Sequence, residues 1–398
     1  MINKIFSMYK RTNFSKGMVK KYLLRALLAL ISLIIFAGAV WLINKDNKHY
    51  QALAAASYVS GVVRAVISDD TTVDNAGSEG LRIGEQQIKV EVTSGEHKGE
   101  IHQITNTISA LYNIYVQKGT KIMLLISTQQ NGSYNVSIYG YDRSLILVAV
   151  ILLFIVTLVL VGGIKGLKSI LGLAFTLICM IFILVPMVSK GYSAIIVCVV
   201  IIILTSIVCF VILDGINIKT ISAMISTVAG VGIAGLLCLV VEKTAHLSGY
   251  NMQEAENLIL IAVNYKINIR GLLTSGILLA SLGAVMDIAI SVSSSVCEIN
   301  GANENLNISQ LFKSGMNIGR DAMGTMANTL IMVFVGSSFN MLLLIFSYGI
   351  PFFRLINTDQ IAIEILQAVA GSIGIILSVP IAAFCSSFLI SRAKQKDT

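Results

Sequence analysis

The chain has 398 residues, of which 55% are hydrophobic and 13% are charged, and this composition excludes a single soluble domain. The formal net charge is +8, but the excess lies at the two ends: residues 1–25 hold seven Lys and Arg and no acid. Basic ends beside apolar segments are typical of loops facing anionic lipid, so we expect the lipid bilayer as a partner and no nucleic acid. The six cysteines lie in or beside apolar runs without CxxC spacing, which argues against disulfides and thiolate metal sites.

The N-terminal segment predicts a cytoplasmic basic tail at 1–22 and a first transmembrane helix at 23–43. A cleaved signal peptide is the alternative, because the small-residue cluster ALAAAS follows at 52–57. The apolar core is too long for a signal peptide, and the cluster lies too far beyond its end for the usual cleavage geometry. We therefore interpret 23–43 as an uncleaved anchor.

Residues 44–143 predict a small extracytoplasmic β-domain. Alternating runs such as IKVEVT (88–93), KIMLLIS (121–127) and YNVSIYG (134–140) are separated by Gly, Asn and Asp, as strands and turns are. We expect an OB-like barrel or a sandwich. His97 and His102 lack an HExxH pattern or a cysteine partner, so we interpret them as solvated residues and expect neither a metal nor a cofactor.

Residues 144–391 predict a seven-helix transmembrane domain, followed by a basic cytoplasmic tail at 392–398. The fold class is thus a polytopic α-helical membrane protein with about eight transmembrane helices and a β-domain between the first two. With the N-terminus inside, the cytoplasmic side collects fifteen Lys and Arg and the short outer loops five, so both termini are expected in the cytoplasm. The expected later spans are 144–162, 168–188, 192–213, 220–241, 271–296, 325–348 and 363–391.

The sequence GVGIAG (230–235) matches the GxGxxG pattern of dinucleotide-binding proteins, but it lies inside an apolar span. No strand can precede it there, so a nucleotide site is not expected. Its three glycines, Gly230, Gly232 and Gly235, are instead expected to let helices pack closely.

Asp287 lies inside the apolar stretch 281–299, where a carboxylate needs a physical reason. Residues three, four and seven apart share a helix face, and the residues so aligned form one small, polar stripe: Gly276, Ala280, Gly283, Ala284, Asp287, Ser291, Ser294, Ser295 and Glu298. A carboxylate at bilayer depth costs about 3 kcal/mol on insertion scales, so this stripe must pack against another helix or border water. Asp287 is either a packing residue or a titrating, cation-binding group on a transport path.

The seventh span is the expected neighbour of this stripe. In GRDAMGTMANTLIMVFVG (319–336), Asp321, Thr325 and Asn328 recur at helical spacing, and Gly324, like Gly283, would allow close approach. Glu298, Arg320 and Asp321 are expected to meet near the cytoplasmic surface. Asp287 then lies deeper along its helix, beyond the reach of Arg320 unless the seventh span begins deeper than expected.

Several motifs together resemble the YibE/F family of bacterial multi-pass membrane proteins. They are LGAVMDIAISVSSSVCEI, GRDAMGTMANTLIMVFVG, YDRS at the start of the second span, and GEHKGE in the β-domain. The resemblance runs from about residue 57 onward. It implies the same architecture in a bacterial cell membrane and marks Asp287, Arg320, Asp321 and Asn328 as motif positions, but it brings no catalytic residues.

The sequence bears on three classes of function. A permease or exporter of a small solute or ion would use the polar face of the sixth and seventh spans as its path. A scaffold or sensor would present the β-domain to a partner, and a homo-oligomer or another membrane partner fits either class. An intramembrane hydrolase is not expected, because GAVMD is not GxGD and no membrane histidine or GxSG motif is present.

Overall fold

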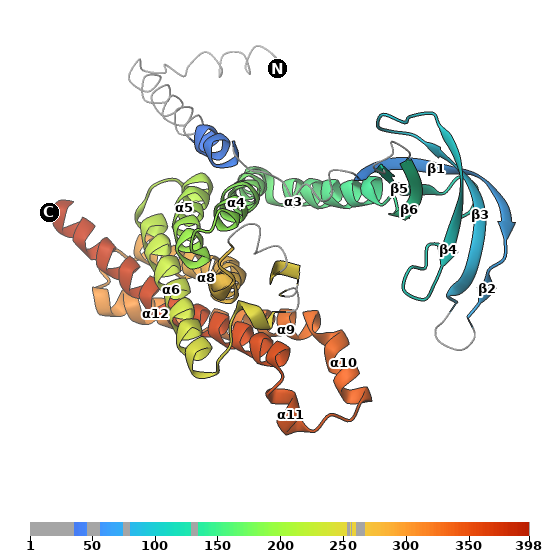
Figure 1. The fold of residues 1–398 in the computed structure, drawn as a ribbon. Coiled ribbons are helices and arrows are strands. Elements are labelled where there is room, and N and C mark those ends of the chain that lie inside the picture. The colour runs from blue at the N-terminus through green and yellow to red at the C-terminus, as the bar shows by residue number, and fades with distance from the viewer. Residues whose placement is uncertain are drawn as a thin grey trace, which may run out of the picture. The chain divides into compact units, whose positions relative to one another are not determined.

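The computed structural model describes residues 36–45, 56–74, 80–128, 134–252, 255, 257–259 and 267–397. It divides into two compact units (Figure 1): Lys48–Val161, and Met1–Asn47 together with Gly162–Thr398. Residues 36–44 are helical and agree with the end of the predicted first span. The basic tail at 1–22 and the rest of that span lie outside the described residues.

The first unit contains a β-domain built as an antiparallel half-barrel. Its strands are β1 (Ala56–Asp69), β2 (Thr72–Val73), β3 (Arg82–Val92), β4 (Ile101–Ile108), β5 (Lys121–Thr128) and β6 (Tyr134–Tyr141). The sheet order is β2-β3-β1-β5-β6, and β4 also pairs with β3. Because strand side chains alternate between faces, Ile88 and Val90 of β3 and Ile122 and Leu124 of β5 are fully buried inside. The predicted strands are confirmed.

Asp142 joins this β-domain to the helix that follows it. Its Oδ1 accepts from the backbone N (3.0 Å) and the hydroxyl (2.5 Å) of Ser144, and its Oδ2 accepts from Ser60 of β1 (3.3 Å). Its own backbone N–H donates to the carbonyl of Lys121 in β5. These bonds lower the pKa of Asp142, the Ser144 hydroxyl having the largest effect. The helix therefore starts from a carboxylate that is tied to two strands.

The next helix, α3 (Ser144–Cys179), is interrupted at Gly163, whose φ of 56° and ψ of −135° are not helical. It continues through a π-helical turn, η2 (Met180–Leu184), into α4 (Val185–Ser189). The conformation of Gly163 is one that essentially only glycine adopts without strain. The regular helix is thus interrupted two residues after the first unit ends at Val161.

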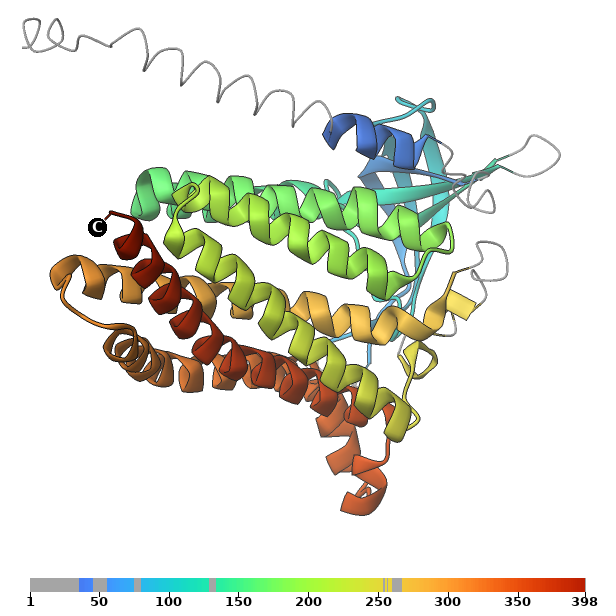
Figure 2. The ribbon, with the colours of Figure 1, turned by 90° about the vertical axis from the view of Figure 1, so that its left-hand side faces the viewer.

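The second unit is a helical bundle (Figure 2). Its main helices are α5 (Ala194–Asp214), α6 (Ile218–Thr244), α8 (Leu272–Ala302), α9 (Ile308–Ser337) and α12 (Asp359–Asp397). Shorter elements are η3 (Gly249–Asn251), η4 (Ile269–Gly271), α10 (Phe339–Ser347) and α11 (Phe352–Ile356). The long helix α12 packs against α6, α8 and α9, while α5 packs against α6 and α8.

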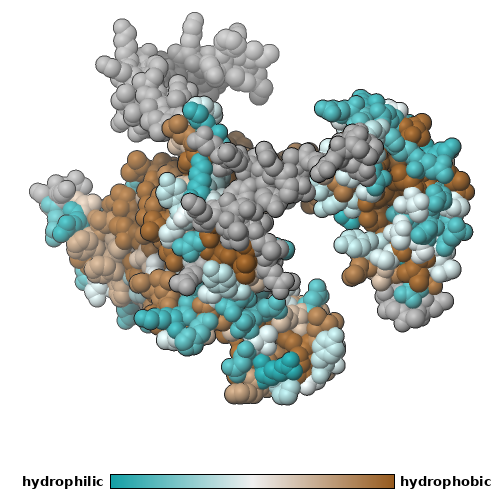
Figure 3. All heavy atoms as spheres, viewed as in Figure 1, coloured by the Kyte–Doolittle hydropathy of each residue, from teal (hydrophilic) through white to brown (hydrophobic). Residues whose placement is uncertain are grey.

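Five described helices are long and apolar enough to cross a membrane, or six if the bent pair α9 and α10 forms one span. This agrees with a multi-pass membrane protein, and the visible face of α5 and α6 is largely hydrophobic (Figure 3). The span predicted at 325–348 falls on this bent pair, whose first helix begins well before residue 325. The helix begins at Ile308 with a capping box between Asn307 and Gln310, and α9 and α10 meet at an angle of 57°.

Polar contacts group the helix ends into two sets. At one end Lys168 donates to the Leu213 carbonyl (2.9 Å) and Lys394 to that of Glu304 (2.5 Å). At the other end Asn44 donates to the Phe182 carbonyl (2.8 Å), and Asn251 bonds Asp359 (2.8 Å). When successive helices alternate in direction, the end of one helix lies beside the start of the next, and the contacts in these two sets join such ends.

Candidate functional site

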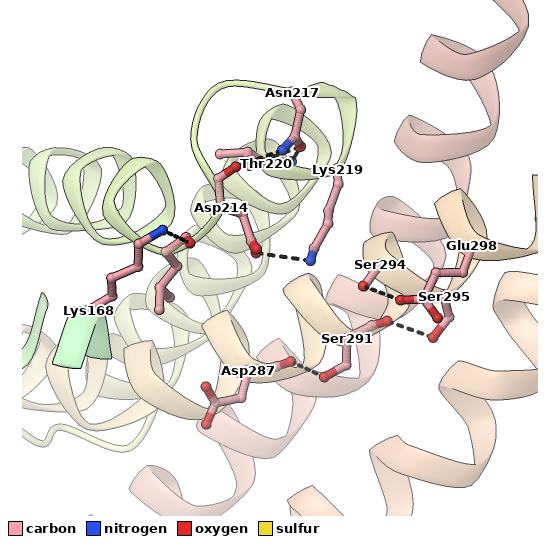
Figure 4. A network of polar contacts seen from close by, with 11 residues as sticks. Lys168, Asp214, Asn217, Lys219, Thr220, Asp287, Ser291, Ser294, Ser295 and Glu298 are labelled. Atoms are coloured by element: carbon pink, nitrogen blue, oxygen red, sulfur yellow. Dashed lines mark hydrogen bonds and ion pairs between the residues drawn. The ribbon is translucent and has the colours of Figure 1, made fainter. Parts of the chain in front are cut away.

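The polar stripe of α8 lies along an exposed face of the helix. Asp287, Ser291 and Glu298 are exposed, whereas Val285 and Val292, on the other side of α8, are fully buried. The serine hydroxyls bond within the helix itself (Figure 4): Ser291 donates to the carbonyl of Asp287 (2.7 Å), Ser295 to that of Ser291 (2.9 Å), and Ser294 to Glu298 (3.4 Å). Such back-bonding satisfies the hydroxyls without a partner helix.

The carboxylate of Asp287 has no hydrogen bond or ion pair within the described part of the chain. It points away from the ion pair between Asp214 and Lys219 (Figure 4). The stripe was expected to be covered by the seventh span, and the described residues do not cover it.

Helix α9 also turns its polar side outward. Its buried positions are small or apolar: Leu311, Gly315, Gly319, Ala327 and Leu330. Its exposed positions include most of its polar residues: Lys313, Asn317, Arg320, Asp321, Thr325, Asn328 and Thr329. The predicted motif residues Arg320, Asp321, Thr325 and Asn328 thus share one side of α9, opposite to the side that packs.

Two glycines fix how α9 lies against α8. A Cβ added at Gly315 would come within 2.6 Å of Val296 Cγ2, and one at Gly319 within 3.3 Å of Val292 Cγ2. A step of four residues toward the C-terminus of α9 therefore corresponds to four residues toward the N-terminus of α8. The two helices are thus antiparallel and pack through a GxxxG motif. The same register sets three further pairs level with one another: Lys313 with Glu298, Arg320 with Ser291, and Gly324 with Asp287.

This register corrects two expectations. The polar stripes of α8 and α9 do not face each other, because valines and glycines fill the interface. Arg320 and Asp321 also do not meet Glu298 near the surface: α9 begins at Ile308, so they lie about two turns deeper. Arg320 is instead within about one turn of the level of Asp287.

The glycines expected to pack helices divide into two groups. A Cβ at Gly230 would come within 2.9 Å of the Gly374 carbonyl in α12, and one at Gly235 within 2.7 Å of Leu278. A Cβ added at Gly232, Gly283 or Gly324 would meet no atom of a neighbouring helix within 4 Å. The close packing expected at these glycines is therefore not found among the described residues. Sequence reasoning missed Gly315 and Gly319, although their GxxxG spacing could have identified them.

A further polar cluster lies at the turn between α5 and α6. Lys219 Nζ lies 3.0 Å from Asp214 Oδ2, and Asn217 caps α6 by accepting from the backbone N of Thr220 (2.9 Å). Neither Lys219 nor Asp214 was singled out as a site residue from the sequence. Figure 4 shows this cluster at the end of the bundle where α8 carries Glu298.

The comparisons with known proteins follow this division of the chain. The model of the YibE/F-like protein family matches residues 150–392, and that of the YibE/F family N-terminal domain matches residues 58–141. The chain belongs to the YibE/F family. Neither the curated proteins nor the solved structures that were compared give a match.

In this YibE/F chain, GEHKGE lies in the turn between β3 and β4, where Glu100 collects three donors. Its carboxylate lies 3.1 Å from His97 Nδ1 and 3.1 Å from His102 Nε2, and accepts from the Tyr134 hydroxyl (2.5 Å). These bonds, that of Tyr134 above all, lower the pKa of Glu100. No group of three or more His, Cys, Asp or Glu that could hold a metal is found among the described residues.

Asp69 is the second such carboxylate in the β-domain. It accepts from the hydroxyl of Thr71 (2.5 Å) and of Tyr115 (2.8 Å), and from the side-chain amide of Gln86 (3.3 Å). These bonds, the Thr71 hydroxyl first, lower the pKa of Asp69 to about 2. Asp69 therefore ties β1 to β3 and to the segment that precedes β5.

Proposed function

We propose that this YibE/F protein is a permease or exporter of a small solute or ion, with its path along the polar faces of α8 and α9. The observation that carries the proposal is Asp287, an exposed carboxylate on a helix of membrane-spanning length. Ionisable groups at such depth are typical of substrate, ion and proton pathways.

Asp287 would bind a proton or a cation in this mechanism. Ser291, Ser294 and Ser295 extend the polar surface toward Glu298, and Thr325 and Asn328 add hydroxyl and amide groups on α9. The path needs water on one side of these faces, since lipid would leave their polar groups unsolvated. The exposed faces suit a small hydrophilic solute, while the lack of a metal-ligand group among the described residues gives no support to a soft metal.

Substitution of Asp287 tests this proposal. Asp287→Asn keeps the size of the side chain and removes its charge, so it should abolish flux of protons or small cations in proteoliposomes while leaving the melting temperature in detergent unchanged. Asp287→Glu should retain part of the flux. Gly232→Ala is the matched control, because Gly232 also lies on an open face. Unchanged flux in Asp287→Asn would refute the role of this carboxylate.

A scaffold or sensor is the second candidate, and the junction at Asp142 favours it. This residue links β1 and β5 to the first turn of α3, so a ligand that shifts the strands would also shift the helix. Deleting residues 57–140 should then remove function, whereas Asp287→Asn should have little effect. Measuring both variants side by side distinguishes the two candidates.

We also propose the finer architecture that these functions need: eight spans, an OB-like β-domain and both termini in the cytoplasm of a bacterial cell. The break at Gly163 supports two spans within the 46 residues Ser144–Ser189, because one straight helix of that length would extend about 69 Å. The pairing of β1 with both β3 and β5, and of β5 with β6, supports OB-like connectivity.

A further inference from the structure

The outward polar faces of α8 and α9 cover the same depth of the bundle. On α8 the face runs from Gly283 to Glu298, and on α9 from Lys313 to Asn328, each about 23 Å long by helical rise. That is about three quarters of the thickness of a bilayer's hydrocarbon core. Because α8 and α9 pack against one another in the register set by Gly315 and Gly319, the two faces lie at the same depth on neighbouring helices.

Lipid is a poor cover for these two faces. They hold the charged residues Asp287, Arg320 and Asp321, each of which costs about 2.5–3.5 kcal/mol at the centre of a membrane helix on insertion scales. The packed side of α9 is small or apolar, and that of α8 is mostly apolar apart from Thr274, Ser275, Ser281 and Ser293, so the charged residues of both helices lie on their outer sides. An outer face of this kind belongs to an interface with protein or with water that protein encloses.

The charges on the two faces complement each other. The face of α8 carries the acids Asp287 and Glu298, and that of α9 carries Lys313 and Arg320 with one acid, Asp321. When a second copy is rotated by a two-fold axis, the acidic face of α8 in each copy can meet the mainly basic face of α9 in the other. Charge complementarity therefore favours a second copy of this chain as the occupant.

We propose that a second copy of this chain covers these faces, with α8 of each copy packed on α9 of the other about a two-fold axis along the membrane normal. A rotation about the membrane normal does not change how deep a residue lies in the membrane. Two residues at the same depth within one chain are therefore also at the same depth when they belong to different copies. Glu298 then meets Lys313 of the second copy, and the depth of Asp287 differs from that of its Arg320 by about one helical turn, ~6 Å. The open glycines Gly283 and Gly324 allow the two helices to approach closely.

The interface also completes the candidate site. If the proposed function holds, the path lies between the copies, and Arg320, Thr325 and Asn328 of one copy face Asp287 of the other. The pairing itself does not depend on transport. Its test therefore measures association rather than flux, so the two proposals can fail separately.

Charge reversal at the outer pair tests the interface. Energy transfer between donor- and acceptor-labelled full-length chains in liposomes should report self-association of the unmodified protein. Glu298→Lys and Lys313→Glu should each weaken self-association by about tenfold or more, because each sets like charges opposite one another twice in the dimer. Mixing the two variants should restore association, since both contacts in the mixed pair are again between opposite charges.

Lys165→Glu is the matched control, since Lys165 is an exposed lysine on α3, outside the two faces. It should associate like the unmodified chain. Melting temperatures in detergent verify folding of each variant, and both Glu298 and Lys313 are exposed. The proposal is overturned if the unmodified chain is monomeric in liposomes, which would leave the faces to another protein. It is also overturned if the single reversals have no effect or if mixing them fails to restore association.

Discussion

At the residue scale, Asp287 marks what helical spacing can and cannot predict. The spacing of small and polar residues correctly placed it on one stripe with Ser291 and Glu298, because side-chain direction follows from the helical repeat. Spacing does not specify which side of a helix meets which neighbour. That is decided by Gly315 and Gly319, whose contacts with α8 and α12 turn the polar side of α9 outward.

The carboxylate of Asp69 should make the β-domain sensitive to acid. Its folded-state pKa of about 2 lies below the ordinary value, so its contribution to stability is present above about pH 4 and is lost as the pH falls toward 2. We expect the melting temperature of the protein to fall over this window.

Asp69→Asn should lower the melting temperature at pH 7, because its amide NH₂ would meet donors on Thr71, Tyr115 or Gln86. The same substitution should also weaken the dependence of the melting temperature on pH below about pH 4. Asp70→Asn is the control from the neighbouring position. Melting curves followed by circular dichroism between pH 7 and 2.5 give the comparison, and parallel curves for all three proteins would contradict the prediction.

At the element scale, the sequence predicted most helices and strands but not the first half of α9. A hydropathy window detects uniformly apolar segments, and the first half of α9 contains Lys313, Asn317, Arg320 and Asp321. An amphipathic pattern was present, and so was the capping box at Asn307 and Gln310 that marks its start. The break at Ser338 follows Gly336 and Ser337, a Gly/Ser pair of the kind at which helices kink, but a hydropathy window does not detect such a pair.

Two glycines on α6 provide a matched test of helix packing. Gly230→Ala should destabilise the protein by about 1–3 kcal/mol, because its Cβ would lie 2.9 Å from the Gly374 carbonyl and from Val285 Cγ1. Gly232→Ala, two residues away, meets open space and should be neutral or more stable by up to about 1 kcal/mol. Thermal unfolding in detergent distinguishes them, and equal effects would contradict the observed packing.

The break in α3 provides a second pair of variants. Gly163→Ala should cost about 1–3 kcal/mol, because φ of 56° with ψ of −135° is strained for any residue with a Cβ. Gly162→Ala should be tolerated, since the added Cβ would meet no atom within 4 Å and the φ of Gly162 is not positive. Melting temperatures of the two variants give the measurement, and the prediction fails if they agree.

At the scale of the whole molecule, contacts between helix ends agree with the alternation inferred from the distribution of basic residues. Lys168, Lys219 and Lys394 contact helix ends in one set, and Asn44 and Asp359 belong to the other. The positive-inside rule groups the same helix ends from the charge along the chain, and which of the two sets is cytoplasmic stays a prediction. It could not predict which helices lie at the centre, a place that α12 takes.

Cysteine labelling in whole cells tests the orientation. In a background without the native cysteines, Glu304→Cys should resist a membrane-impermeant maleimide, because this exposed residue lies at the end predicted to be cytoplasmic. Tyr250→Cys, exposed at the opposite end, should be labelled. Permeabilised cells should label both, and the opposite pattern would reverse the proposed topology.

The outward polar face of α9 has a consequence for how the protein is made. The apolar side of this helix rests on α12, which is the last long helix to leave the ribosome. Until α12 has been synthesised, much of that side has no partner and the other side is unsuited to lipid. Stable integration of α9 should therefore await completion of the chain, and a protein truncated before residue 359 should leave α9 accessible to proteases.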